Sequence, residues 1–286
     1  CTVMVAVLAT AVVTYRAGGL FERPINRTDQ AHFLQYYDWM KKHGIDEAYR
    51  RGCDFMDWPS GHARETLDAA CTERGRRRTL FLWGDSFAQS LSLGIRSLLP
   101  PEDRLAQVAT SLCRPAFGEI DTHVPEGRCS RSNQFAIAKI KELRPDIVVL
   151  AQKGGHDQTD WKAMTEQLTS LGAGRVVLVG PGPRWRPSLP EVVATHYWGS
   201  DFSRVSHGLD REPFDTDAHL QATLAGTPHL SYVSLVGGLC NQDGCVAVVP
   251  ESSAADLIAF DFGHLTLKGS LFVAHGQLRS YLLTAE

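Results

Sequence analysis

The sequence lacks a positive charge excess, an internal repeat and an apolar run that could cross a bilayer by itself. Its 286 residues carry a formal net charge of −3, which argues against a general basic surface that recruits nucleic acid. We interpret the arginine-rich stretch 74–78 as a solvated loop before a strand rather than a phosphate or lipid site. A hydrophobic content of 43% indicates a globular protein with one large domain, or one domain and a small extension.

The apolar run 3–13 lies at the start of a chain whose first residue is Cys1 rather than methionine. This run is shorter than the roughly 20 residues that span a bilayer. We interpret residues 1–16 as the end of a transmembrane helix of a longer protein, with Tyr15 and Arg16 at the membrane interface. The end of a signal sequence and a lipoprotein start at Cys1 are the alternatives. An apolar run directly after the cysteine would make a poor lipoprotein tether.

The sequence also lacks any C-x-x-C pair, which disfavours a zinc site. Apart from Cys1, six cysteines remain, and they allow 15 pairings. Neighbours in the sequence suggest the bridges Cys53–Cys71, Cys113–Cys129 and Cys240–Cys245. Local bridges of this kind fit an oxidising compartment, whereas six buried free thiols are the alternative. No histidine outside the motifs described below shows metal-ligand spacing, and we expect no metal site.

From Thr79 onward, short apolar runs alternate with helical stretches. Strands are expected at residues 79–83, 105–110, 147–151, 175–180 and 230–235, and helices at residues 86–99, 133–143, 161–171 and 267–283. Continuous apolar strands separated by helices indicate an α/β fold with a parallel sheet covered on both faces. Residues 20–70 carry helical signals without strand signals, and we expect the stretch Pro181–Pro228 to form irregular loops that shape a cleft.

Two short blocks carry groups suited to nucleophilic catalysis. Ser86 follows the first strand in the turn Gly84-Asp85-Ser86 and begins a helix, whose N-terminal amides can hold a developing oxyanion. A serine hydroxyl needs a base at neutral pH. Asp261 precedes His264 by three residues and can orient its imidazole. Either block alone is common in helix capping, but both in this order predict a catalytic triad.

On these residues the sequence resembles the SGNH hydrolases, which carry a Gly-Asp-Ser block near their start and an Asp-x-x-His block near their end. The resemblance covers residues 79–283. Within that family, the sequence is most similar to the SGNH domain fused behind the integral-membrane acyltransferase-3 bundle of bacterial surface-polysaccharide O-acyltransferases. The narrower resemblance rests on the stretches Leu82–Ser86 and Cys113-Arg114-Pro115, the Cys240/Cys245 pair and the stretch His264–Ser270.

The resemblance implies a flavodoxin-like, three-layer SGNH fold with a central parallel sheet and an N-terminal helical extension. Residues 17–78 would be a periplasmic linking region and residues 79–286 the catalytic domain. The domain would lie on the periplasmic face of the bacterial inner membrane, anchored by the apolar segment at its start. Its partner would be the membrane acyltransferase bundle, in the same polypeptide.

The activity implied is transfer of an acyl group, most commonly acetyl, to a hydroxyl of a cell-surface polysaccharide. The acyl donor, which can derive from acetyl-CoA, would be a substrate, and neither a metal nor a bound cofactor would be needed. A carbohydrate esterase that uses the same triad with water as acceptor is one alternative. A non-catalytic glycan-binding module that keeps the fold is another, and replacing Ser86 by alanine would discriminate it.

The sequence departs from the family pattern at two places. Phe87 stands where this subgroup has a histidine, and we expect it to contribute only packing. The family also has a Gly-x-Asn-Asp block, whose asparagine donates to the oxyanion, and here His156 occupies the asparagine's place. A neutral imidazole N–H can donate in the same way, or His156 is a solvent-facing loop residue. The candidate oxyanion donors are therefore Ser86, Ser111 with the other backbone N–H groups around Ser111–Cys113, and His156.

Three residues after the strand at 175–180 are candidates for binding the acceptor. Trp185 can stack on a sugar face, while Arg184 and Arg186 can bind its hydroxyls or acidic groups. The alternative is a surface loop that holds a packed tryptophan.

Overall fold

The computed structural model describes residues 28–118, 127–252 and 256–284. The transmembrane segment expected at residues 1–16 lies outside these ranges. Within them, no helix combines the length and the hydropathy that crossing a membrane requires.

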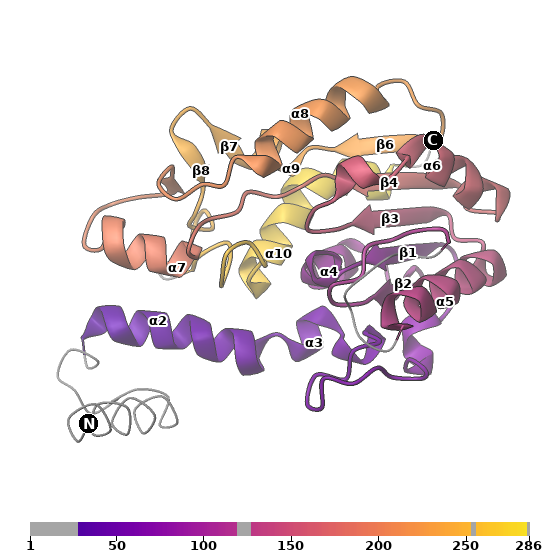
Figure 1. Ribbon diagram of the computed structural model, residues 1–286, viewed down its shortest axis with the longest axis horizontal. Helices are drawn as coiled ribbons and strands as arrows, with labels where there is room; N and C mark the ends of the chain where they lie inside the picture. Colours follow the sequence, from indigo (N-terminus) through magenta and orange to yellow (C-terminus); the bar gives the residue numbers. More distant parts are fainter. Residues whose placement is uncertain (1–27, 119–126, 253–255, 285–286) are drawn as a thin grey trace, which may run out of the picture.

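A parallel sheet of five strands forms the centre of the molecule (Figure 1). Its strands are β1 (Thr79–Gly84), β2 (Arg104–Ala109), β3 (Ile147–Ala151), β4 (Arg175–Val179) and β6 (Leu230–Val233). Their spatial order is β2-β1-β3-β4-β6, and every neighbouring pair is parallel. From β1 the chain adds β2 on one side and then β3, β4 and β6 on the other, so the order of strands switches direction between β1 and β3. Folds with this strand order bind ligands at that switch point.

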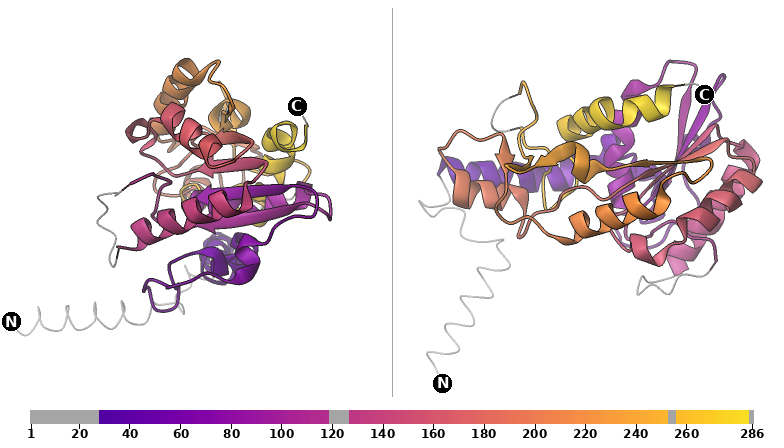
Figure 2. Two further views of the ribbon diagram at one scale, coloured as in Figure 1. Left: turned by 90° about the vertical axis from the view of Figure 1, so that its right-hand side faces the viewer. Right: turned by 90° about the horizontal axis from the view of Figure 1, so that it is seen from above.

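Helices cover both faces of the sheet, so the expected three-layer α/β fold is confirmed. The helices α4 (Ser86–Leu98) and α10 (Leu267–Val273) pack on one face. The helices α5 (Arg128–Leu143), α6 (Trp161–Ser170) and α8 (Glu212–Leu224) pack on the other. The right-hand view of Figure 2 shows α10 in yellow and α8 in orange on opposite sides. Because both faces are covered, the strands consist of apolar runs without alternation.

Helix α10 lies directly against α4. A Cβ atom on Gly94 would approach the Ser270 carbonyl oxygen to 2.1 Å, and the Gly94 amide donates to Ser270 Oγ over 3.0 Å. This close packing brings the segment before α10 up to the N-terminus of α4. After α10 the chain continues through the π-helical turn η8 (Ala274–Leu278) into α11 (Arg279–Leu283), so the closing helix expected at 267–283 is present with one widened turn.

The N-terminal extension packs on the same face as α4. It consists mainly of α2 (Asp29–Trp39), the π-helical turn η2 (Met40–Gly44) and α3 (Asp46–Tyr49). The buried Tyr37 hydroxyl accepts from the Leu257 amide over 2.8 Å, and the buried Tyr49 hydroxyl donates to the Leu265 carbonyl over 2.8 Å. The helical extension is thereby fixed to the segment that carries Asp261 and His264.

The expectation of irregular loops throughout Pro181–Pro228 is wrong. This stretch contains α7 (Leu189–Val192), the π-helical turn η7 (Val193–Tyr197), β5 (Arg204–Val205) and all of α8. Pro213 lies in the first turn of α8, where proline favours helix initiation rather than breaking the helix. Strand β5 joins β8 (Gly244–Val246) and β7 (Cys240–Asn241) in a small antiparallel sheet.

Candidate active site

The turn after β1 presents Ser86 at the carboxyl edge of the sheet. Only glycine fits at position 84, because a Cβ atom there would lie 1.9 Å from the Ala151 carbonyl oxygen. Asp85 caps α4, with Oδ1 accepting from the Phe87 amide over 2.8 Å and Oδ2 accepting from the Lys153 amide over 2.8 Å. Burial raises the pKa of Asp85, although these amides act in the opposite direction. Asp85 therefore fixes the Ser86 turn against the loop that follows β3.

The three residues of the expected triad lie together in one hydrogen-bonded chain. Ser86 Oγ lies 2.8 Å from His264 Nε2, although 178 positions separate the two residues. His264 Nδ1 lies 2.8 Å from Asp261 Oδ2. The other oxygen of Asp261 accepts from the amides of Gly263 and His264, over 3.0 and 2.9 Å. This geometry allows His264 to take a proton from Ser86 while Asp261 fixes the imidazole.

The carboxyl group of Asp261 is suited to its ionised form. Burial by itself would raise the pKa of Asp261, but the hydrogen bond and charge of the His264 ring outweigh burial, together with the amides of Gly263 and His264. The net effect is a lowered pKa. The carboxylate is therefore available to stabilise an imidazolium that forms during reaction.

Phenylalanine rings surround the imidazole of His264. The ring centroids of Phe87, Phe262 and Phe260 lie 4.5, 5.2 and 5.8 Å from that of His264. The side chains of His264 and Asp261 are only 15% and 10% exposed. Phe87 thus packs directly on the imidazole.

Ser111 does not have a free donor, which corrects its expected place in the oxyanion site. Its hydroxyl and its amide both donate to Asp54, over 2.7 and 3.2 Å. The neighbouring Leu112 has φ of 68° within a turn that the Cys113 amide closes on the Thr110 carbonyl over 2.9 Å. Among the described residues, the Leu112 amide has no hydrogen-bond acceptor. Leu112 rather than Ser111 therefore offers a free backbone donor in this turn.

His156 is buried, so the interpretation as a solvent-facing loop residue is wrong. Its side chain packs near Trp161, with ring centroids 6.0 Å apart, and the residue is 1% exposed. Burial, helped by the charge of Arg184, lowers the pKa of His156 to about 4, so the ring is neutral at pH 7. Neither ring nitrogen has a partner within the described ranges, and no hydrogen bond joins the ring to Ser86 or His264. Donation by His156 to an oxyanion stays a prediction.

The three acceptor-binding candidates differ in exposure. Trp185 is 1% exposed, and a ring so deeply buried cannot stack on a sugar. The guanidinium of Arg184 is also buried and pairs with Glu212 and, over 3.6 Å, with Asp210. Arg186 is exposed and pairs with Asp210 over 2.9 Å. The packed-tryptophan interpretation therefore fits Trp185.

Of the hollows that adjoin the Ser86–His264–Asp261 chain, two lie beside the Ser86 turn. A polar one of about 250 Å³ is lined by Lys153, Arg184, Trp185, Arg186, Pro187, Asp210 and Phe262. It adjoins the site on two sides, because the Lys153 amide binds Asp85 and Phe262 lies against His264. The other is apolar and has room of about 30 Å³. Its lining includes Phe87, Leu91, Val179, Trp185, Leu235 and Leu265.

The three disulfides expected from the sequence are confirmed. The Cα atoms lie 5.5 Å apart in Cys53–Cys71, 5.0 Å apart in Cys113–Cys129 and 4.0 Å apart in Cys240–Cys245.

Sequence reasoning missed Asp54 and Lys153 as neighbours of this site, whereas Leu112 lies inside the range Ser111–Cys113 whose amides were candidates. Lys153 could have been found from its place directly after β3, at the edge where parallel strands bind ligands. No local pattern marks Asp54, which lies far from Ser86 in the sequence.

Comparisons with known proteins agree with this architecture. The model of the family "SGNH domain (fused to AT3 domains)" matches residues 52–276. A solved structure, the periplasmic domain of a lipopolysaccharide acetyltransferase from Salmonella ser. Paratyphi A, is similar with a TM-score of 0.70 at 20% sequence identity. The match covers 91% of this chain and 99% of that chain.

A Streptococcus pneumoniae protein described as a platelet activating factor matches with a TM-score of 0.40 at 11% identity, over 89% of this chain and 100% of that chain. No curated protein sequence matches significantly. Because the family model covers well over half of the chain, the protein belongs to the family of SGNH domains that are fused to AT3 domains.

Proposed function

We propose that this domain transfers an acyl group through Ser86 to a hydroxyl of a bacterial cell-surface polysaccharide. The observation that carries the proposal is the hydrogen-bonded chain Ser86–His264–Asp261 in a member of an AT3-fused family. The similarity in fold to a lipopolysaccharide acetyltransferase domain supports the choice of acceptor and of acetyl as the group. The acyl group would come from a membrane acyltransferase part of the same polypeptide, at the periplasmic face of the inner membrane.

The reaction has two halves that use the same groups. His264 Nε2 takes the proton of Ser86 Oγ, which attacks the carbonyl carbon of the donor, and His264 then gives that proton to the leaving group. The acyl-Ser86 ester is next attacked by an acceptor hydroxyl, whose proton passes to His264 and finally to Ser86 Oγ. Asp261 stabilises the imidazolium in both halves. The products are an acylated sugar and free Ser86, and no water is consumed.

Backbone amides would hold the oxyanion of each tetrahedral intermediate. Ser86 is the first residue of α4, and the first amides of a helix have no partner within it. The Leu112 amide is the second donor that we propose. The register of the sheet supports this choice, because Gly84 pairs with Ala109 and the Thr110 amide donates to the Gly84 carbonyl over 2.8 Å. The turn at residues 110–113 therefore lies beside the turn that carries Ser86.

The polar hollow is the proposed acceptor subsite. Lys153 and Arg186 are exposed there, Arg186 beside its partner Asp210, whereas Arg184 is buried and paired with Glu212. The exposed cations would bind sugar hydroxyls or acidic groups.

The apolar hollow is the proposed pocket for the acyl chain, and its size predicts a preference for acetyl. Room of about 30 Å³ holds only about two water-sized groups. Leu235→Ala is expected to enlarge it and raise the butyryl-to-acetyl ratio of kcat/KM by about tenfold, because one methylene in a pocket is worth about that factor or more. The measurement is hydrolysis of matched p-nitrophenyl esters.

Leu220→Ala is the matched control, since Leu220 is equally buried but belongs to the core on the opposite face. It is expected to lower the melting temperature without changing the ratio. An unchanged ratio in Leu235→Ala would contradict the pocket assignment.

Product analysis distinguishes transfer from hydrolysis. The isolated domain, given p-nitrophenyl acetate, is expected to release acetate slowly, because an oriented acceptor is missing. Adding acceptor polysaccharide should divert acetyl groups into O-acetylated glycan, measured by NMR, with less free acetate per turnover. If glycan leaves acetate release unchanged and acetylated polysaccharide loses acetate instead, the protein is an esterase.

A further inference from the structure

Asp54 is a fully buried carboxylate in the part of the chain that precedes the central sheet. It lies next to Cys53 of the first disulfide and is 0% exposed. No lysine or arginine within the described ranges pairs with it. A buried charge is stabilised only if its oxygens are well supplied with hydrogen-bond donors.

Five donors surround the two oxygens of Asp54. Oδ1 accepts from the amides of Met56 and Ser111, over 2.7 and 3.2 Å. Oδ2 accepts from Trp58 Nε1 over 3.1 Å, from Gln89 Nε2 over 2.8 Å and from Ser111 Oγ over 2.7 Å. Asp54 therefore joins its own segment to α4 and to the turn after β2.

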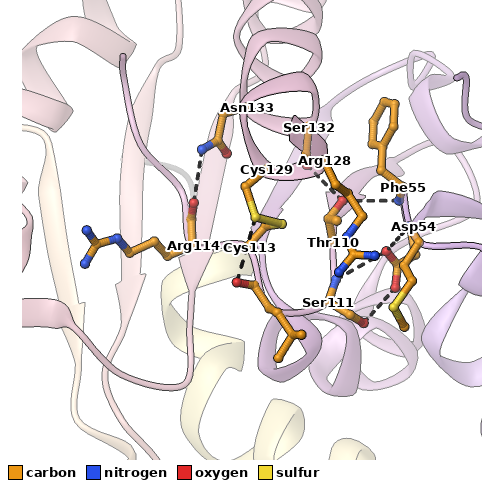
Figure 3. Close-up of a disulfide and its surroundings, with 12 residues drawn as sticks. Asp54, Phe55, Thr110, Ser111, Cys113, Arg114, Arg128, Cys129, Ser132 and Asn133 are labelled. Atoms are coloured by element: carbon orange, nitrogen blue, oxygen red, sulfur yellow. Dashed lines mark hydrogen bonds between the residues drawn. A yellow bond between two sulfur atoms is a disulfide. The ribbon is translucent and has the colours of Figure 1, made fainter. Parts of the chain in front are cut away.

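Two of the residues that Asp54 joins, Gln89 and Ser111, belong to the elements beside Ser86. Gln89 lies three residues after Ser86 on α4, and its Nε2 also donates to the Ala109 carbonyl over 2.7 Å. Ser111 precedes Leu112, whose free amide we propose as an oxyanion donor. Figure 3 shows Asp54 beside Ser111, with the Cys113–Cys129 disulfide on the other side of the turn.

The turn at residues 110–113 holds Leu112 in a backbone conformation that is unfavourable for leucine. A closed turn with positive φ only at its third residue is of type II, which normally requires glycine or asparagine there. Such strain persists only where surrounding contacts impose it. The Asp54 carboxylate on Ser111, the Cys113–Cys129 disulfide and the Ser132–Thr110 hydroxyl contact of 2.8 Å are the contacts that do so.

We propose that Asp54 is a positioning residue for acyl transfer, which holds the Ser111–Leu112 peptide so that the Leu112 amide faces the oxyanion. The inference rests on the proposed function and extends it into residues 17–78, the range expected to be a linking region. Only the central peptide distinguishes a type II turn from a type I turn. Loss of Asp54 would release that peptide, so the Leu112 amide would turn away from the oxyanion. The sheet itself would stay folded.

Asp54→Asn is the first test. An amide side chain keeps the volume but places an NH₂ group against the donors of one oxygen, so at least two hydrogen bonds are lost. We expect kcat for p-nitrophenyl acetate to fall by 10- to 100-fold, somewhat less than the roughly 10²–10³-fold cost of removing an oxyanion donor. KM should change less than threefold, because the ground-state ester does not use this donor fully.

Asp103→Asn is the matched control. Asp103 is also a buried carboxylate that accepts several hydrogen bonds, from Arg77 and Arg78. It comes just before β2, so it lies at the amino ends of the strands, whereas Ser86 lies at their carboxyl ends. Its variant should lower the melting temperature at least as much as Asp54→Asn, with kcat of the folded protein unchanged within twofold.

A backbone substitution separates positioning from simple stabilisation. Replacing Leu112 by its α-hydroxy analogue changes one amide to an ester and removes only the N–H donor, which should lower kcat about 10²-fold. If Asp54 acts through this donor, Asp54→Asn combined with the ester should be no slower than the ester alone. Independent effects would multiply instead, and that result would overturn the proposal.

The remaining outcomes are also decisive. If Asp54→Asn does not fold, Ser111→Ala takes its place in the same cycle, since it removes one Asp54 contact and leaves the disulfide intact. Full activity in the folded Asp54 variant, or a kcat loss matched by Asp103→Asn, would refute positioning. If instead Ser86→Ala retains activity, the proposed function itself fails, whatever the Asp54 variant does.

Discussion

Replacing Ser86 by alanine is expected to lower kcat for acyl transfer by about 10⁴-fold or more. The hydroxyl is the only atom that the His264 ring can activate in the hydrogen-bonded chain, and without it no covalent acyl intermediate forms. The residual rate would come from binding and the oxyanion donors alone. Release of p-nitrophenol, acetylated glycan formation and mass spectrometry of the acyl-protein measure the loss.

Ser97→Ala is the control on the same helix. Ser97 lies near the far end of α4, where its hydroxyl donates to the Gly94 carbonyl over 2.7 Å, and its loss should leave kcat unchanged. An acyl adduct on the Ser86 variant, or undiminished glycan acetylation by it, would refute the serine mechanism. The protein would then be a glycan-binding module or would use another chemistry.

Asp261→Asn is expected to lower kcat by about 10⁴-fold with little change in KM. An asparagine can donate as well as accept at His264 Nδ1, so the imidazole can adopt the tautomer whose Nε2 cannot take the Ser86 proton. The charge that stabilises the imidazolium is lost as well. Because the pKa of Asp261 is lowered, the wild-type carboxylate is ionised at neutral pH and this contribution is fully present there.

The measurement is kcat at neutral pH alongside the melting temperature. Asp160→Asn serves as the control, because Asp160 caps α6 by accepting from two amides and asparagine caps equally well. A loss of less than tenfold in Asp261→Asn would show that His264 needs no partner to act as the base.

Local patterns were enough to predict the sheet and the three residues that form the hydrogen-bonded chain Ser86–His264–Asp261. The residues of β1, β3 and β4 are almost all buried, so each of these strands is a short apolar run that stands out between polar helices, as in Ile147–Ala151. Ser86 and the Asp261/His264 pair lie at element ends, where turn geometry and chemistry leave a recognisable motif. The disulfides were predictable because each joins cysteines that are close in sequence.

The parts that failed depend on contacts between distant segments. Helix α8 buries few apolar side chains, so its sequence has little periodicity, and no helix was expected there. The choice of Ser111 as a donor failed because sequence cannot show that its amide is already bound, by a residue 57 positions earlier. The sequence left Trp185 either stacking on a sugar or packed in its loop, because aromatic residues in proline-rich loops occur both exposed and buried, and the structure shows it buried.

The contact between α10 and α4 has a consequence for the order in which the chain is synthesised. Ser86 leaves the ribosome 178 residues before His264, and the two residues meet only when α10 docks at Gly94. Long-range contacts of this kind form late. During folding the nascent domain therefore carries a serine without its base, and any product truncated before Leu267 lacks the packing that brings His264 to Ser86.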